Sequence, residues 1–374
     1  MVTWTDIRAR RLARHFLTTP GSTPAEVVAA MCGAHAQIPA AGELSVGLRL
    51  AGAVRDDVRA AVWESRELVR TFGPRGTVHL LPTRDLPMWT GALSAVPHPL
   101  PSFGPGVTLT PDELDAVVAG IATVLADAAL TIDELDAALA GTLGGWAVER
   151  TMPAFQELWP RWRMAVGTAA HRGALCFGPD RDRKVTYTSP RRWHPGLVPL
   201  PAEEAQAALL RAYLHSYGPA RPEHFARWLS APVPWAERLF AAADLEPVGE
   251  HGWVVAGDAG FPAGRPGGVR LLPYFDAYAV GSHPRDLVYP GRAAERALNR
   301  SQAGNFPVVL LGGVVGGVWH QKRSGRHLDV TVEPLADLSA ARRRGLDAEV
   351  DRLGAFTGLT PRLTIGPVTV GPHA

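Results

Sequence analysis

Apolar residues recur at helical spacing in several stretches of the chain, and the stretches begin with clear helix starts. The segments Thr23–Glu26, Thr110–Glu113 and Thr131–Glu134 each place a threonine three residues before a glutamate, which is the pattern of an N-terminal capping box. Between Leu114 and Leu139 the apolar residues keep a helical period on both sides of the third box. This region therefore predicts two helices joined by a short turn.

A second helix pair is predicted in the C-terminal half. Pro222–Leu229 and Trp235–Ala242 have helical patterns, and the strand-like segment Gly252–Val255 follows them. Two helices followed by short strands are the element order of a winged helix-turn-helix motif, a class that binds duplex DNA.

Alternating and β-branched residues indicate strands elsewhere. Strands are predicted at Thr77–Leu81, Lys184–Thr188 and Val269–Leu272. The strongest hairpin pattern runs from Val308 to Val332, with a polar, basic turn predicted over His320–His327.

These patterns predict an α+β fold, mainly helical, in three regions. We expect an N-terminal region over 1–105, a middle winged-helix region over 106–200, and a C-terminal winged-helix region with a basic β-hairpin over 201–374. Segments 104–106 and 257–268 are rich in glycine and proline and are typical of linkers.

Composition narrows the class of protein. With 374 residues, of which 46% are hydrophobic, the chain can bury a large core. The longest uncharged apolar run, Phe306–Trp319, is too short to span a bilayer, and Met1–Arg14 lacks the apolar core of a secretory signal. We therefore expect a cytoplasmic protein with no membrane partner. Cys32 and Cys176 allow one disulfide at most and no zinc cluster, so free buried thiols are favoured.

Charges of opposite sign are segregated along the chain. Residues 101–140 hold seven acidic residues and no Lys or Arg, whereas 161–194 hold eight basic residues against two acidic ones and 281–327 hold seven against two. Basic clusters of this kind suit a polyanion such as DNA. The alternative, equally open from the sequence, is that these arginines lie on solvated faces or in ion pairs.

The candidate chemistry lies in the run from Gly33 to Pro39. Pro39 biases Ile38 toward an extended conformation, and in an extended segment His35 and Gln37 point the same way. A base and an amide side by side can orient one water molecule. A histidine beside a helix end is, taken alone, more often structural than reactive.

Segments in the same order along nearly the whole chain resemble the AlkZ/YcaQ family of bacterial DNA glycosylases. The run His35-Ala36-Gln37 resembles the family's Gln-x-Gln or Gln-x-Asp active-site motif, with His in the first position. The other matching blocks are Arg8–Arg14 (first helix), Arg75–Leu80 (Arg-Gly-Thr-Leu-His), Gly173–Pro179 (strand ending in Phe-Gly-Pro), and Phe275–Tyr278 with Arg285 (Asp-x-Tyr loop and a basic residue). The resemblance implies tandem winged-helix motifs that form a C-shaped DNA-binding surface.

The resemblance also implies an activity. We expect a monofunctional, metal-free DNA glycosylase without a cofactor, which excises cationic alkylated purines such as bulky N7-alkylguanine or N3-alkyladenine adducts of natural products. Its partner would be double-stranded DNA that contains alkylated bases, and it would act in base excision repair or in self-resistance. We expect the protein to be a monomer.

Roles follow for individual residues. Gln37 matches the motif position that contacts the nucleophilic water, and His35 matches the first position. A neutral His35 could accept a proton from the water, hydrogen-bond Gln37, or shape the pocket for a different lesion. Asp276 and Tyr278 are candidates for the lesion pocket, although an aspartate that begins a turn is often a local acceptor. The expected DNA contacts are Arg75, His79, Arg285, His320, Gln321, Lys322, Arg323 and Arg326.

Some of these contacts have structural alternatives. His79 could satisfy a strand partner instead of facing DNA, and the basic tip of the predicted hairpin could protect a sheet edge.

Two other functions compete with this interpretation. A winged-helix transcription regulator would bind DNA without chemistry and would not need Gln37. An unrelated hydrolase or metal enzyme is poorly supported, because the 13 histidines form no HExxH and the chain has neither a phosphate-binding loop nor a Gly-x-Ser-x-Gly elbow.

Overall fold

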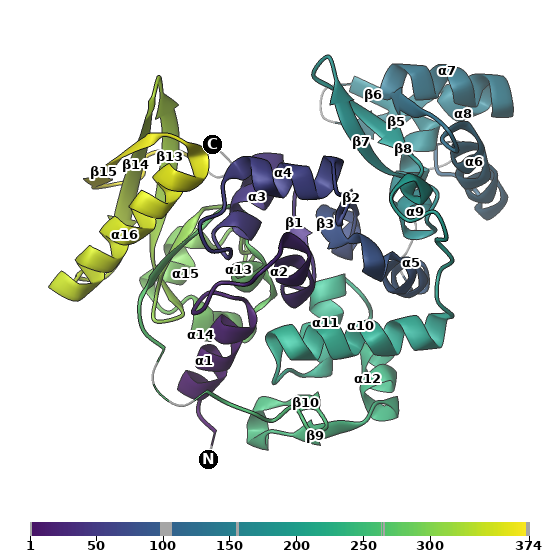
Figure 1. The fold of residues 1–374 in the computed structure, drawn as a ribbon. Helices are drawn as coiled ribbons and strands as arrows, with labels where there is room; N and C mark the ends of the chain where they lie inside the picture. The colour runs from purple at the N-terminus through teal and green to yellow at the C-terminus, as the bar shows by residue number, and fades with distance from the viewer. Residues whose placement is uncertain (1, 98–106, 155–156, 263, 265, 372–374) are drawn as a thin grey trace.

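Helices and small antiparallel sheets alternate along the chain in the computed structural model, which describes residues 2–97, 107–154, 157–262, 264 and 266–371 (Figure 1). The fold is α+β and mainly helical, as predicted.

The N-terminal part surrounds a three-stranded sheet of order β1-β3-β2. Its elements are α1 (Trp4–Arg14), α2 (Pro24–Ala30), β1 (Ala34–His35), α3 (Pro39–Gly47), α4 (Arg55–Trp63), β2 (Leu68–Phe72), the 3₁₀ turn η1 (Pro74–Gly76), β3 (Val78–Pro82) and α5 (Leu86–Ser94). All pairs in the sheet are antiparallel, and His35 lies opposite His79.

The middle part contains the first predicted helix pair. Its elements are α6 (Pro111–Val124), β4 (Ala129–Thr131), α7 (Ile132–Leu143), α8 (Gly145–Val148), β5 (Arg150–Ala154), β6 (Glu157–Pro160), α9 (Val166–His171), β7 (Cys176–Arg181) and β8 (Lys184–Thr188). Thr110 and Thr131 form complete capping boxes with Glu113 and Glu134, so the predicted helix starts are correct. The β4-β8-β7 sheet packs beside these helices.

The C-terminal part contains the second helix pair and a larger sheet. Its elements are α10 (Ala202–Tyr217), α11 (Pro222–Leu229), α12 (Val233–Ala242), β9 (Leu245–Pro247), β10 (Trp253–Val255), β11 (Val269–Leu272), α13 (Ala277–Gly281), α14 (Arg285–Val288), α15 (Arg292–Ala297), β12 (Val308–Leu311), β13 (Val314–Ser324), β14 (His327–Pro334), α16 (Ala340–Thr357) and β15 (Thr360–Ile365). The sheet has the order β11-β12-β13-β14-β15.

The hairpin predicted at Val308–Val332 is present as β13–β14, but the apolar run from Val308 to Trp319 forms two antiparallel strands, β12 and the start of β13, and the turn of the hairpin is shorter than expected. His320 pairs with Thr331, and the pairing continues as far as Ser324 opposite His327. The predicted turn over 320–327 was therefore wrong in its first half, because those polar residues belong to a strand that extends beyond the core.

The hydrophobic cores cross the predicted regions. One core combines buried residues between Ala25 and Phe356, and a second combines residues of α5 with residues of α10, α11 and α12. The predicted boundary at 105/106 and the linker at 104–106 lie outside the described residues. The described residues of 257–268 form neither helix nor strand. The three-region division stays a prediction.

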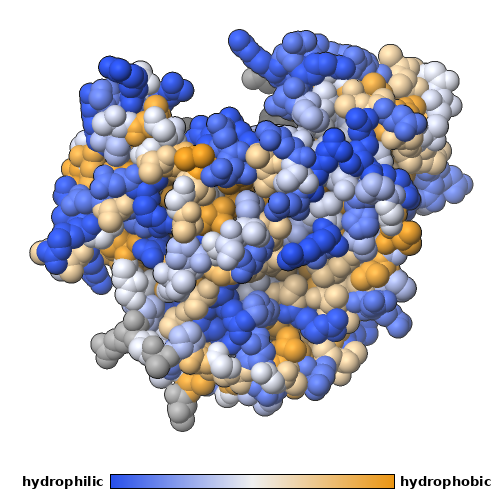
Figure 2. Space-filling view, viewed as in Figure 1, coloured by the Kyte–Doolittle hydropathy of each residue, from blue (hydrophilic) through white to orange (hydrophobic). Residues whose placement is uncertain are grey.

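Two β-hairpins rise on opposite sides of the molecule with α3 and α4 between them. Figure 1 shows the β13–β14 hairpin on one side and the β7–β8 hairpin on the other. The space-filling view shows a notch between the two hairpins, and hydrophilic residues lie on both of its rims (Figure 2).

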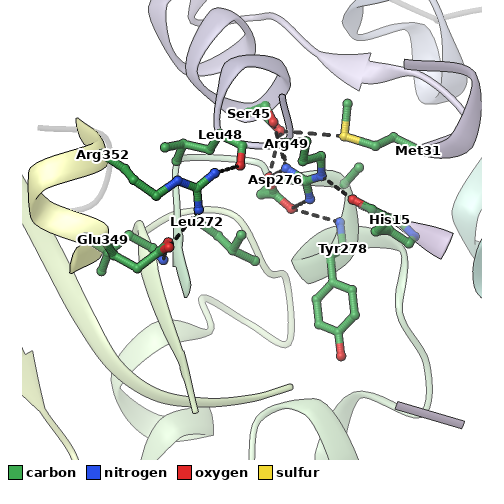
Figure 3. A network of polar contacts seen from close by, with 12 residues as sticks. His15, Met31, Ser45, Leu48, Arg49, Leu272, Asp276, Tyr278, Glu349 and Arg352 are labelled. Carbon is green, nitrogen blue, oxygen red and sulfur yellow. Dashed lines mark hydrogen bonds and ion pairs between the residues drawn. The ribbon is translucent and has the colours of Figure 1, made fainter. Parts of the chain in front are cut away.

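A buried ion pair fastens the end of α3 to the C-terminal part. Two Arg49 nitrogens donate to the two carboxylate oxygens of Asp276, each over 2.8 Å, and both side chains are fully buried (Figure 3). The Ser45 hydroxyl donates to the same carboxylate over 2.6 Å, and Arg49 also donates to the His15 carbonyl over 2.8 Å. Burial raises the pKa of Asp276, but Arg49 and Ser45 outweigh it and hold that pKa below its usual value.

Helix α16 contacts the same end of α3. Arg352 donates to the Leu48 carbonyl and, over 2.7 Å, to Glu349, whose carboxylate also accepts the Leu271 backbone N–H over 3.1 Å (Figure 3). The chain immediately after the candidate motif is therefore held by segments more than two hundred residues away.

We predict that Arg49→Met lowers the free energy of unfolding by about 3–5 kcal/mol, because it leaves the Asp276 carboxylate buried without its counter-ion. Arg343→Met is the matched control, since Arg343 pairs with Asp347 on the exposed face of α16, and it should cost less than about 1 kcal/mol. Urea unfolding followed by tryptophan fluorescence measures both. Equal effects would contradict the role given to the buried pair.

Candidate active site

The motif segment is confined between strand β3 and helix α3. The Ala36 N–H donates to the Val78 carbonyl over 2.7 Å, which continues the β1–β3 pairing by one residue. Ile38 is extended (φ −102°, ψ 104°), as predicted, and α3 begins directly after it. A Cβ on Gly42 of α3 would lie 3.0 Å from both the Ala36 Cβ and the His35 carbonyl oxygen. Glycine at this position therefore lets α3 pack directly on the motif.

His35 and Gln37 are linked to each other and to β3. The Gln37 backbone N–H donates to His35 Nδ1 over 3.4 Å, and the Gln37 side-chain oxygen accepts the Val78 N–H over 3.3 Å. Gln37 is exposed, whereas His35 is only 8% exposed. The carboxamide is thus oriented by the sheet edge while its second lone pair and its NH₂ group stay available.

The His35 ring lies between two aromatic rings. It stacks on Phe275 at a centroid distance of 4.5 Å and meets the edge of His79 at 5.1 Å. Burial, and then the positive charge of Arg75, lower the pKa of His35 to about 3. The ring is therefore neutral throughout the physiological range, in contrast to the near-neutral titration of a free histidine.

The hydrogen bond into Nδ1 favours one tautomer. A neutral imidazole that accepts at Nδ1 carries its proton at Nε2. His35 Nε2 has no partner among the described residues, so in this tautomer it is an N–H donor available to a ligand. This arrangement favours a role in orienting a polar group over a role as the acceptor of its proton.

A small cavity adjoins the His35 ring. Its volume is about 10 Å³ and its lining includes His35, Arg75, His79, Tyr217 and Phe275, which makes it about the smallest cavity that can hold one water molecule (roughly 10–15 Å³).

Backbone strain is concentrated around this cavity. Three non-glycine residues that line it have positive φ angles: Cys32 (56°), Arg75 (60°) and Phe275 (55°). Strained conformations of this kind persist where the surroundings impose them, and they cluster at functional sites.

Three predicted DNA contacts instead point into the protein. Arg75 donates to the Trp228 carbonyl over 2.6 Å, and Arg285 donates to the Ala279 and Val280 carbonyls. Burial makes the largest contribution to lowering the pKa of each arginine. These contacts occupy Nη1 of Arg75 and both terminal nitrogens of Arg285 inside the protein, and a role of the two arginines in DNA binding stays a prediction.

His79 is also internal. It is 4% exposed, and its Nδ1 lies 2.8 Å from the Thr77 carbonyl, which favours the structural alternative.

The two candidates for the lesion pocket are buried as well. The Asp276 carboxylate accepts hydrogen bonds from Arg49 and Ser45, and also from the Tyr278 N–H over 3.0 Å. The Tyr278 hydroxyl donates to the Gly313 carbonyl over 2.8 Å. Neither side chain can contact a lesion from this position. Their place in the structure is to hold the turn that carries Phe275 against His35.

The tip of the β13–β14 hairpin does lie in solvent. Lys322, Arg323 and Arg326 are exposed, and none of them forms an ion pair among the described residues. His320 and Gln321 are half-buried lower on the strand, and burial, with the charge of Lys322, lowers the pKa of His320. The free cations are therefore concentrated at the end of the hairpin.

The β7–β8 hairpin was not singled out from the sequence. Its tip carries Arg181, Arg183 and Lys184, and its turn is made by Asp182 and Arg183 with φ angles of 50° and 63°. Arg181 pairs with Glu134 and Lys184 pairs with Asp133, but Arg183 forms no ion pair among the described residues. The excess of basic residues over 161–194 was the available signal.

Within the described residues, no three His, Cys, Asp or Glu side chains are grouped as metal ligands would be, and no helix has the length and apolarity needed to cross a membrane. Cys32 and Cys176 are free and buried.

Comparison with known proteins gives one consistent result. A family model described as DNA glycosylase AlkZ-like matches residues 28–356. An interstrand DNA cross-link repair glycosylase from Streptomyces sahachiroi is 30% identical over 376 residues, covering 96% of this chain and 97% of that protein. The solved structure of Streptomyces sahachiroi DNA glycosylase AlkZ superposes with a TM-score of 0.81 at 27% identity, over 97% of this chain and 100% of that one.

We predict that the His35 ring stays neutral from pH 8 down to pH 5, because a histidine whose pKa is about 3 gains its proton only in stronger acid. The nitrogen chemical shifts of ring-labelled histidine, assigned by comparison with a His35→Gln variant, measure this directly. A titration midpoint above pH 5 would contradict the buried environment described here.

Proposed function

The chain belongs to the AlkZ-like family of DNA glycosylases and is a monofunctional glycosylase, and from this premise we propose that it hydrolyses the N-glycosidic bond of cationic alkylated purines at the His35–Gln37 site. The observation that carries the proposal is the pairing of an exposed, oriented Gln37 carboxamide with a neutral His35 ring on one strand end.

The chemistry requires little machinery. Alkylation at N7 of guanine or N3 of adenine gives the base a positive charge, so the base leaves as a neutral molecule without a general acid. The enzyme then has to hold a water molecule against the anomeric carbon and stabilise a transition state with oxocarbenium character.

Gln37 fits the first task. Its side-chain oxygen already accepts one N–H, from Val78, and a second lone pair can accept a hydrogen bond from the attacking water. After the water oxygen has bonded to the anomeric carbon and the base has left, the surplus proton of that water passes to solvent. The same oxygen directs the negative end of a dipole toward the developing positive charge.

His35 fits a positioning role beside it. Its Nε2–H can donate to the water oxygen, which leaves another lone pair of that oxygen free to attack. Because the ring is neutral, it adds no positive charge next to the cationic sugar. The alternative of a proton acceptor needs the other tautomer and the loss of the Gln37 N–H bond.

DNA binding is assigned to the notch. We infer that the two basic hairpins contact phosphates or grooves on either side of the site, and that the helix pairs with their hairpins act as winged-helix units. His320 and Gln321 stay candidate contacts on the strand that leads to the tip.

The relative's name as an interstrand cross-link repair glycosylase supports a preference for large lesions. We extend this to bulky N7-alkylguanine or N3-alkyladenine adducts in duplex DNA, in base excision repair or self-resistance.

We predict that Gln37→Ala slows base release from duplex DNA carrying a single N7-alkylguanine by at least about a hundredfold, as expected when an oriented dipole is removed from a transition state. Gln302→Ala, in an exposed loop, is the matched control and should release base at the parent rate. His35→Gln should lose less than the ~10²–10⁴-fold expected for removal of a general base. Quantifying abasic sites over time distinguishes these rates. A folded Gln37→Ala protein with parental activity would place the site elsewhere.

We predict that the triple variant Lys322→Ala, Arg323→Ala and Arg326→Ala weakens binding to undamaged duplex DNA and flattens its salt dependence, by up to ~0.9 in the slope of log K against log salt for each lost phosphate contact. The control is the pair Arg342→Ala and Arg344→Ala, exposed at the start of α16. Fluorescence anisotropy over a series of salt concentrations measures both. If the two variants change the slope equally, the hairpin tip does not contact phosphates.

A further inference from the structure

A second and larger cavity opens on the opposite face of the sheet from His35. It has a volume of about 480 Å³ and lies between α3, α4, the β1–β3–β2 sheet and the start of the β7–β8 hairpin. This volume is within the range of small-molecule sites, roughly 300–1,000 Å³.

Sheet register explains why the cavity and the His35 ring are separated. Leu80 lies opposite both Ala34 and Arg70 across the three strands, whereas His35 lies opposite His79 in the neighbouring row. Neighbouring rows point to opposite faces of a sheet. Leu80 and Arg70 line the large cavity, and His35 and His79 line the small one.

The large cavity reaches the motif segment. Ala36 and Pro39, which flank Gln37 and Ile38 in the chain, both line it. The cavity therefore adjoins the stretch of chain that carries the exposed Gln37 side chain.

The walls are mainly apolar. Val58, Val62 and Leu80 are buried, and Trp63 and Pro39 complete the apolar surface. Glu43 at the rim is neutralised by Arg59 over 2.9 Å and by Arg55 over 3.4 Å. A ring system would gain the transfer free energy of leaving water along these walls.

Asp180 also lines the cavity, and the remaining charged residue of the lining is Arg70. Its guanidinium stacks on Phe177 at 4.4 Å, and its buried Nε–H has no hydrogen-bond partner among the described residues. Its other nitrogens form no ion pair or hydrogen bond within the described part of the chain, and burial lowers its pKa while the charge of Asp180 opposes that shift. A buried donor without a partner costs free energy that a ligand oxygen would recover.

We propose that this cavity, lined by Val58, Val62, Trp63, Leu80 and Arg70, binds the substituent of the alkylated base, and that it selects substituents that are apolar ring systems carrying an oxygen acceptor for Arg70. The inference rests on the proposed glycosylase site at Gln37, and it names the class of adduct that this site accepts.

The test compares two duplexes of one sequence in which the same guanine carries at N7 either a methyl group or a (hydroxynaphthyl)methyl group. Val62→Phe fills the cavity, and Arg70→Met removes the donors while keeping an unbranched side chain. The measured quantity is the kcat/KM for the naphthyl duplex divided by the kcat/KM for the methyl duplex. Each variant should lower this ratio by about tenfold or more, which is the scale of one lost hydrogen bond to a charged group or of one blocked apolar contact. Val233→Phe, at an exposed position on α12, is the matched control and should leave the ratio unchanged.

A second measurement uses the unmodified protein and does not depend on the folding of a variant. Free 1-naphthol should raise the KM for the naphthyl duplex more than the KM for the methyl duplex, because it competes for the cavity. A variant effect that is equal on both duplexes, or no preference in the competition, would overturn the cavity proposal. Failure of the unmodified protein to release base from either duplex would instead overturn the proposed function.

Discussion

The buried ion pair between Arg49 and Asp276 is the constraint on which the candidate site depends. Arg49 lies two residues after the end of α3, the helix that begins two residues after Gln37, and Asp276 follows Phe275, whose ring stacks on His35. The two partners are 227 residues apart in the chain. A bidentate contact of this kind is costly to break inside the protein, because either charge alone would be buried without a counter-ion. It therefore fixes the position of the Phe275 ring relative to the motif strand.

This arrangement determines the chemistry that the motif can perform. By enclosing His35 between Phe275 and His79, the fold keeps the imidazole neutral. A neutral His35 ring is suited to the proposed reaction, in which positive charge develops on the sugar, because a protonated ring would add to the positive charge that Arg75 already places beside the cavity. The structure thus combines a buried, neutral His35 ring with an exposed Gln37 carboxamide two residues further along the chain. The exposed cations of the β13–β14 hairpin tip, for which we propose a role in DNA binding, belong to a different part of the structure.

Local sequence signals predicted much of the fold. The capping boxes at Thr110 and Thr131, the extended residue before Pro39 and the strands at Lys184–Thr188 and Val269–Leu272 are present, because each depends on neighbours a few residues away. The box predicted at Thr23 is only half formed, since the Thr23 hydroxyl accepts the Glu26 N–H but the Glu26 carboxylate accepts the Ser22 N–H. Individual side-chain roles were harder to predict. Arg75, Arg285 and Asp276 carry charge and occur in blocks that resemble the family. Inside the protein, however, the two arginines donate to backbone carbonyls and Asp276 pairs with Arg49. The low pKa of His35 comes from burial against Phe275, which is 240 positions away in the chain. The cavity next to Arg70 comes from the approach of β7 to β2. Neither feature could be predicted from neighbouring residues in the sequence.

The most direct test of the central claim is a high-resolution crystal structure of the protein with duplex DNA that carries a cationic pyrrolidine analogue of the oxocarbenium sugar. The account predicts one ordered water within hydrogen-bond distance of the Gln37 side-chain oxygen and His35 Nε2, facing the atom that replaces the anomeric carbon. A sugar analogue bound away from the motif strand, or one whose nearest water is held by other side chains, would contradict it.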